Sequence, residues 1–163
     1  MLIYLKNNNT LCVDEFQFRC AIGKNKLKKN KVEGDYSTPI GKHKLLDVYY
    51  RKDKIKNFQT ELNRIVIKKN IGWCNDIKSK FYNKPIIKKK HIRHEIMFRK
   101  DRKYDLVIVL DYNFKKPILG KGSAIFIHIT NNYKPTAGCI ALDKKDMLIL
   151  LRLITKNTFV KIN

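Results

Sequence analysis

The sequence is poor in acidic residues, it has no cysteine pair at metal-binding spacing, and it has no long apolar run. Only 14 of its 163 residues are Asp or Glu, against 36 Lys and Arg, so the formal net charge is +22. No apolar run is longer than Leu106 to Leu110, which has the length of a strand and falls far short of the ~18 residues that a membrane span needs. The four cysteines lack CxxC spacing. These shortages argue against a membrane span, a small disulfide framework and a zinc ribbon.

The excess of positive charge predicts attraction to anions such as nucleic acid, anionic lipid or an anionic polymer. Most of the cations are Lys, and Lys, Asn and Ile are all abundant, a mixture that an AT-rich coding sequence also produces. Arg clusters interleaved with aromatic residues would point more specifically to nucleic acid, and none is obvious. Lysine-rich patches at residues 24–31, 52–56 and 88–90 lie beside turn signals, so we expect them to be solvated.

The chain is expected to form one domain over residues 1–163. Its four prolines are scattered, no Ser/Gly-rich linker divides it, and no internal repeat is present. The first residues lack the charged, apolar and small-residue segments of a signal peptide, so no signal peptide is expected.

Most of the chain is predicted to form strands, which makes the expected fold class mainly β with a few short helices. Apolar and polar side chains alternate over residues 11–22, as they do in a half-buried strand. Further strands are expected near residues 45–50, 64–68, 104–111, 123–130 and 158–162. Helical spacing over residues 143–153 predicts a helix that Asp143 caps.

A histidine and a cysteine carry the main chemical signal. His128 lies inside a strand that reads as buried, and Cys139 follows eleven residues later, after a loop. A cysteine becomes a useful nucleophile when a nearby imidazole favours its thiolate. Gly138 permits a tight turn in which backbone amides point at a developing oxyanion, and Thr136 supplies a hydroxyl nearby.

This segment resembles the active-site signature of the YkuD-type L,D-transpeptidases, in which a strand histidine and a loop precede Ser/Thr-His-Gly-Cys. The matching residues here are His128 and the Thr-Ala-Gly-Cys of residues 136–139. The EGD and TPIG of residues 33–41 are similar to a strand entry of that family. Residues 72–76, 82–83, 94–95 and 104–105 resemble its small single-domain branch, so that the likeness spans roughly residues 10–163.

The resemblance implies a mainly β catalytic domain of the β-sandwich or mixed-sheet type, with no cofactor and no metal. It implies that Cys139 attacks the carbonyl of the diamino acid at position three of a peptidoglycan tetrapeptide stem. The terminal D-Ala then leaves, and an amine of another stem resolves the thioester. His128 would serve as general base and then as general acid, and the N–H groups of Gly138 and Cys139 would form the oxyanion hole.

Substrate contacts are expected from residues near this motif and from aromatic and histidine residues that would wall a groove. These are Thr136, Ala137, Trp73, His94 and Tyr112. His91 and His94 have i, i+3 spacing but lack two further ligands, so no zinc site is expected. Ala137 stands where the family has histidine, and Ala141 stands where it has Arg or Asn. These two departures leave the acyl acceptor open.

Three alternatives remain at this point. The protein could be an L,D-carboxypeptidase or hydrolase that passes the acyl group to water, a basic nucleic-acid-binding module in which His128 and Cys139 are structural, or a degenerate binding protein on the same fold, against which the retained His–Cys pair argues. The favoured reading has peptidoglycan stem peptides as partners, no specific nucleic acid, no membrane span and a monomer. The resemblance implies the periplasm or cell envelope, whereas the missing signal peptide leaves the cytoplasm open.

Overall fold

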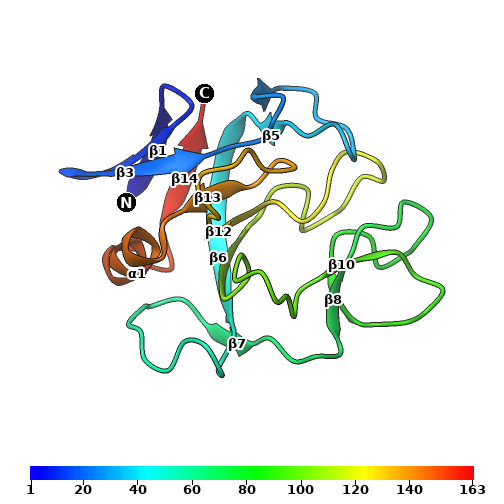
Figure 1. The fold of residues 1–163 in the computed structure, drawn as a ribbon. Coiled ribbons are helices and arrows are strands. Elements are labelled where there is room, and N and C mark those ends of the chain that lie inside the picture. The colour runs from blue at the N-terminus through cyan, green and yellow to red at the C-terminus, as the bar shows by residue number, and fades with distance from the viewer.

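A sheet that closes on itself forms the body of the structure, a computed structural model that describes residues 1–163 (Figure 1). Around the ring the strands are β11 (Leu106–Leu110), β12 (Phe126–Ile129), β13 (Ile140–Leu142), β3 (Phe16–Ala21), β2 (Thr10–Val13), β1 (Leu2–Lys6), β14 (Phe159–Ile162) and β6 (Gly41–Tyr50). Strand β6 then pairs with β11, which closes the ring. The result is a closed, barrel-like sheet, which agrees with the expected mainly β fold but does not confirm the sandwich form of it. Parallel and antiparallel pairs occur together, so the sheet is mixed.

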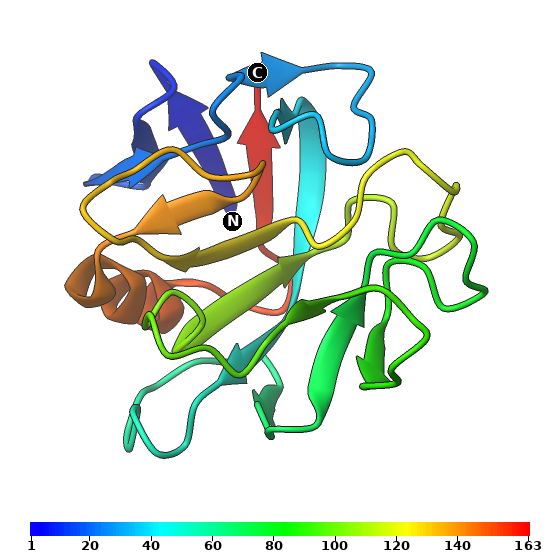
Figure 2. The ribbon, with the colours of Figure 1, turned by 45° about the vertical axis from the view of Figure 1, so that its right-hand side comes forward.

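The remaining elements lie outside this ring. They are β7 (Arg64–Val66), which pairs with β6, the three-stranded sheet β10 (His94–Ile96), β8 (Ile71–Cys74) and β9 (Pro85–Ile87), the short pair β4 (Leu27–Lys28) and β5 (Thr38–Pro39), and the helix α1 (Lys144–Leu153). Two views show α1 and the three-stranded sheet on opposite sides of the barrel (Figure 2). No helix has the length and apolarity that crossing a membrane would take.

Local sequence patterns predicted about half of these elements, and the structure has one helix where a few short helices were expected. Strands occur within all the expected segments, and α1 begins after Asp143, whose carboxylate accepts a hydrogen bond from the Lys145 N–H at 2.8 Å. The single strand expected over residues 11–22 is wrong, because a tight turn at Asp14, with a φ of 48°, divides it into the hairpin β2–β3. The alternation persists through the turn, since Leu11 and Phe18 are paired and face the same core.

Two hydrophobic clusters lie on opposite faces of the barrel wall. Successive side chains of a strand point to opposite faces, so Ile127 and Ile129 of β12 pack inside the barrel, while Phe126 packs outside it. Trp73 of β8 covers Phe126, with ring centroids 5.0 Å apart. Cys139 belongs to this outer cluster. The small sheet therefore covers the outer face of the wall and brings its own residues toward Cys139.

Candidate active site

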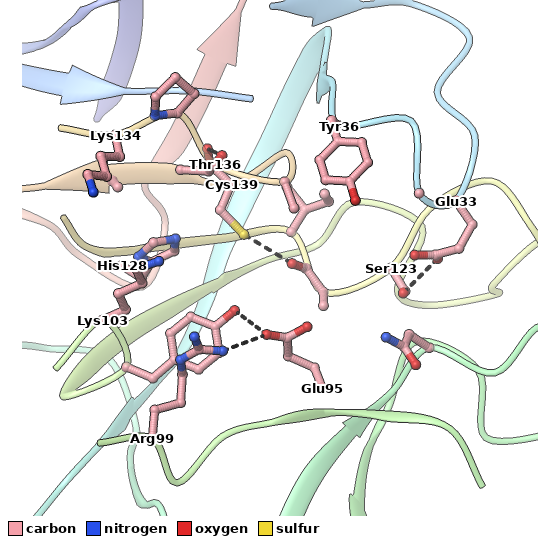
Figure 3. Close-up of a pocket in the computed structure, with 18 of the residues that line it drawn as sticks. Glu33, Tyr36, Glu95, Arg99, Lys103, Ser123, His128, Lys134, Thr136 and Cys139 are labelled. Atoms are coloured by element: carbon pink, nitrogen blue, oxygen red, sulfur yellow. Dashed lines mark hydrogen bonds and ion pairs between the residues drawn. The ribbon is translucent and has the colours of Figure 1, made fainter. Parts of the chain in front are cut away.

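A cavity of about 380 Å³ lies beside this outer cluster (Figure 3). Asn75 and four stretches of chain line it, at residues 31–36, 93–104, 123–131 and 134–141. Of the residues singled out in the sequence, His128, Thr136, Ala137 and Cys139 line this cavity together. Segments that are far apart in the chain thus meet around one thiol.

The Cys139 thiol is held by the backbone at the start of β12 and just before it. Its Sγ donates to the carbonyl oxygen of Ala124 at 3.2 Å and accepts from the Phe126 N–H at 3.4 Å. Burial raises the pKa of the thiol to about 12; the Phe126 N–H and the charge of Lys31 oppose this rise, whereas the charge of Glu95 adds to it. The resting residue is therefore a neutral, oriented thiol.

His128 enters the cavity from β12, which runs parallel to β13 and pairs His128 with Ala141. Its Nδ1 lies 2.8 Å from the carbonyl oxygen of Ile129. Because a carbonyl only accepts, Nδ1 carries the hydrogen and Nε2 keeps a free lone pair. Burial lowers the pKa of His128 to about 4. Figure 3 shows His128 and Cys139 pointing into the cavity from these neighbouring segments. The shifts of both pKa values favour a neutral imidazole and a neutral thiol.

The turn that presents Cys139 is held by the Thr136 hydroxyl. Thr136 Oγ1 donates to the Cys139 carbonyl oxygen at 2.6 Å and accepts from the Gly138 N–H at 3.0 Å. The expected pair of oxyanion donors therefore needs correction, because the Gly138 N–H already has a partner. Gly138 instead supplies conformation, since its φ of 139° lies in the region that favours glycine.

Replacing Gly138 by alanine is expected to strain this turn. A Cβ at Gly138 would lie 2.8 Å from the backbone oxygen of Ser37, in addition to the cost of the positive φ. We expect the free energy of unfolding to fall by about 2–3 kcal/mol, measured by urea denaturation. The matched control is Gly120→Ala, where φ is 77° and nothing lies within 4 Å of the added Cβ. Equal losses in the two variants would contradict the close contact at Ser37.

Three residues expected in the substrate groove lie outside the cavity. Trp73 is only 1% exposed and sits in the outer core. Tyr112 donates to the carbonyl oxygen of Lys121 at 2.6 Å and packs edge-on against His43. His94 lies against Gly72, with its Nδ1 2.7 Å from the carbonyl oxygen of Ile92. Each of these side chains packs against other parts of the protein and does not line the cavity. We therefore correct their assignment as groove residues.

Trp73 nevertheless contacts a chain of hydrogen bonds that ends at the thiol. Its Nε1 donates to Asn83 Oδ1 at 2.9 Å, and the same oxygen accepts the Ala124 N–H at 3.0 Å. Ala124 has a φ of 54°, and its carbonyl oxygen accepts from Cys139. Asn83 thereby fixes the backbone turn that orients the Cys139 thiol, a contact that the sequence did not reveal.

Glu95 lines the cavity, whereas the sequence analysis expected its neighbour His94 to do so. Adjacent strand residues face opposite sides, and it is Glu95 that lines the cavity. Its Oε1 accepts from the Tyr104 hydroxyl at 3.0 Å and pairs with Arg99 at 3.3 Å. The Tyr104 ring lies edge-on to His128, with centroids 5.3 Å apart. The HE pair in the sequence was informative, but the face of β10 was assigned wrongly.

Lys31 is a site residue that the sequence analysis missed. The patch at residues 24–31 was expected to be solvated, yet Lys31 is 3% exposed and lines the cavity. Its Nζ lies 2.7 Å from Asp35 Oδ1. The available signal was the i, i+4 spacing of Lys31 and Asp35 around the Glu33–Gly34 turn.

Charges of both signs line the cavity, and cations are in excess. The cations are Lys31, Arg93, Arg99, Lys103 and Lys134, and the acids are Glu33 and Glu95. Glu33 is engaged, since it accepts from the Tyr82 hydroxyl at 2.5 Å and from Ser123 Oγ at 2.7 Å. No group of three or more His, Cys, Asp or Glu side chains is arranged to hold a metal ion. The arrangement suits a nucleophilic thiol reacting with an anionic ligand.

Comparison with known proteins gives one match. The family model described as YkuD, the L,D-transpeptidase catalytic domain, matches residues 1–162. The matched region contains the whole cavity and both His128 and Cys139. No curated protein and no solved structure matches the chain.

Proposed function

The chain belongs to the YkuD family of L,D-transpeptidase catalytic domains, and from this we propose that it is a cysteine acyltransferase acting on peptidoglycan stem peptides. Cys139 forms a thioester with the stem, the terminal D-Ala leaves, and the acyl group passes to an amine, which cross-links two stems. The observation that carries the proposal is the meeting of His128 and Cys139 in one cavity, where His128 lies on β12 and Cys139 directly precedes the neighbouring parallel strand β13.

In the first step, Sγ of Cys139 bonds to the stem carbonyl carbon while Nε2 of His128 takes the thiol proton. The C–N bond to D-Ala then breaks, and His128 returns the proton to the leaving amine. Burial disfavours both the thiolate and the imidazolium. Proton transfer therefore accompanies the attack, instead of producing a resting ion pair beforehand.

In the second step, an acceptor amine attacks the thioester carbonyl and gives a proton to His128. The C–S bond breaks, and the departing sulfur regains a proton from His128. The negative oxygen formed in each step needs a hydrogen-bond donor. We assign this role to the Cys139 N–H, because the Gly138 N–H is bonded to Thr136.

Polar atoms that lack partners support a peptide ligand of negative charge. Asn75 lines the cavity, and its Oδ1 is buried without a hydrogen-bond partner, so it is ready to accept an N–H of the stem. Arg93 and Lys134 line the cavity without an ion-pair partner. These cations would attract the carboxylates of a stem peptide. The proposed place of action is the cell envelope, where such stems occur.

The proposal is tested with a disaccharide-tetrapeptide as substrate. Intact-protein mass spectrometry at early times is expected to find the parent protein carrying the stem without its D-Ala. Chromatography with mass detection is expected to find a cross-linked dimer among the products. Cys139→Ala serves as the blank, and it should give neither the adduct nor the dimer.

Two outcomes would contradict parts of the proposal. Tripeptide without dimer would mean that water accepts the acyl group, which replaces the transferase by a carboxypeptidase with the same thioester. Absence of both adduct and product, from a protein that also fails to react with a carbapenem, would overturn the acyl chemistry itself.

A further inference from the structure

A buried lysine lies against the turn that carries Cys139. Lys31 is 3% exposed, although lysine is almost never fully buried without a partner. Glycines leave room for it on two sides: a Cβ at Gly122 would lie 2.9 Å from Lys31 Cε, and a Cβ at Gly138 would lie 3.4 Å from its Nζ. Both glycines have a positive φ, 101° and 139°. The lysine side chain therefore passes between two turns that only glycine forms without strain.

Asp35 holds this ammonium and is itself held in place. Asp35 Oδ1 accepts from Lys31 Nζ at 2.7 Å and from the Ser37 N–H at 3.0 Å, and its Oδ2 accepts from the Val32 N–H at 2.9 Å. Burial alone would raise the pKa of Asp35, but these hydrogen bonds outweigh it and lower the pKa to about 2. Asp35 is thus a carboxylate near neutral pH. One hydrogen bond accounts for only one of the three N–H groups of Lys31.

The proposed acyl transfer gives no role to the positive charge of Lys31. The cavity also presents Glu95 to the thiol, whose negative charge disfavours a thiolate, while Tyr104 and His128 are neutral there. A fixed cation in a water-poor site acts strongly on a nearby developing anion, because little solvent screens it.

We propose that Lys31 is an electrostatic element of the active site, whose ammonium beside the Gly138–Cys139 turn stabilises the negative charge that develops on the sulfur and on the acyl oxygen. The part that concerns the acyl oxygen rests on the proposed acyltransferase function. The part that concerns the sulfur does not, since it applies to any reaction of the Cys139 thiolate.

Two reagents, applied to the Lys31→Met variant, distinguish the effect on the sulfur from the effect on the acyl oxygen. Iodoacetamide alkylates a thiolate without forming an oxyanion, whereas a carbapenem acylates it through one. At a fixed pH well below the thiol pKa, the thiolate fraction is expected to fall about tenfold, as for a rise of one pKa unit. Peptide mapping after alkylation reads Cys139 directly, with the other three cysteines as internal references. Carbapenem acylation is expected to fall further than alkylation.

The matched control is Lys28→Met. Lys28 pairs with the same carboxylate, at 3.3 Å from Asp35 Oδ2, but its side chain is 45% exposed and does not line the cavity. Both rates should stay within about twofold of the parent protein. Lys28 also remains as a partner for Asp35 in the Lys31→Met protein, which favours folding of that variant.

Asp35→Asn is expected to change the alkylation rate in the opposite direction. This variant tests the proposal even if Lys31→Met does not fold. Removing the carboxylate leaves the charge of Lys31 uncompensated, so Cys139 alkylation is expected to become several-fold faster. A purely structural role for the pair predicts slower reactions in both variants. Slower alkylation in Asp35→Asn, or unchanged alkylation in a folded Lys31→Met, would overturn the proposal. If only the acylation arm fails in the parent protein while alkylation shifts as expected, the acyltransferase function fails and the charge effect on sulfur stands.

Discussion

Cys139→Ser is expected to form the carbapenem acyl-enzyme at least about a thousandfold more slowly than the parent protein while keeping its fold. The nucleophile is lost, because a hydroxyl is far more reluctant than a thiol to give up its proton. The structure is kept, because serine is similar in size and can still donate to the Ala124 carbonyl and accept from the Phe126 N–H, as Cys139 does. Time-resolved intact-protein mass spectrometry measures the adduct, and calorimetry measures Tm.

Cys74→Ser is the matched control for this experiment. Cys74 is also a free and buried thiol, but it lies outside the cavity. Its variant should keep the acylation rate, even if the buried hydroxyl lowers Tm. An adduct that persists at the parent rate in Cys139→Ser, or that maps to Cys74, would show that the reactive residue has been misassigned.

His128→Gln is expected to lower the acylation rate by about 10²–10⁴, the range typical of a lost general base. Glutamine can fill the space beside Tyr104, but it cannot take the thiol proton. Because burial lowers the pKa of His128 to about 4, the parent protein should keep its base form well below the usual histidine value of 6.5. The acid limb of its rate profile is therefore expected near pH 4, and it should be missing from the variant.

The pH dependence of the free energy of unfolding provides a second test of the buried, neutral His128. Between pH 6.5 and 4 the unfolded chain binds a proton at His128 and the folded chain does not, so the parent protein loses stability as the pH falls. The loss from this group amounts to about 3 kcal/mol at most, and His128→Gln should lack it. His94→Gln is the control, since His94 lies outside the cavity and its loss should leave the acylation rate and the acid limb unchanged. An acid limb near pH 6.5 in the parent protein would contradict a buried, neutral His128.

His128 and Cys139 could be singled out from the sequence because their signal is local. A histidine in a β-branched run predicts a strand, and Gly-Cys after a loop predicts a tight turn at a thiol. Strand β12 and the glycine conformation at Gly138 agree with these predictions. The cap of α1 at Asp143 is equally local, because a carboxylate accepts an N–H two residues ahead. Short-range geometry of this kind follows from the residues themselves.

Side-chain direction was the first thing that the sequence left undecided. A pattern places residues on a strand without saying which face meets a cavity. His94 and Glu95 are neighbours on β10, and only the packing of the small sheet turns Glu95 toward Cys139. Trp73 likewise lies behind the wall of the cavity, and it is linked to the thiol by hydrogen bonds through Asn83 and Ala124.

The sequence alone determined that this protein is mainly β and that a helix follows Asp143, and it singled out His128 and Cys139 as the candidate catalytic pair. The tertiary structure decided the closure of the sheet through β6 and β11, and the burial of Lys31 between Gly122 and Gly138. The physical reason is distance along the chain. Hydrophobic periodicity and turn preferences act over a few residues, whereas the charges and donors around the thiol come from segments about a hundred residues apart, which only folding brings together.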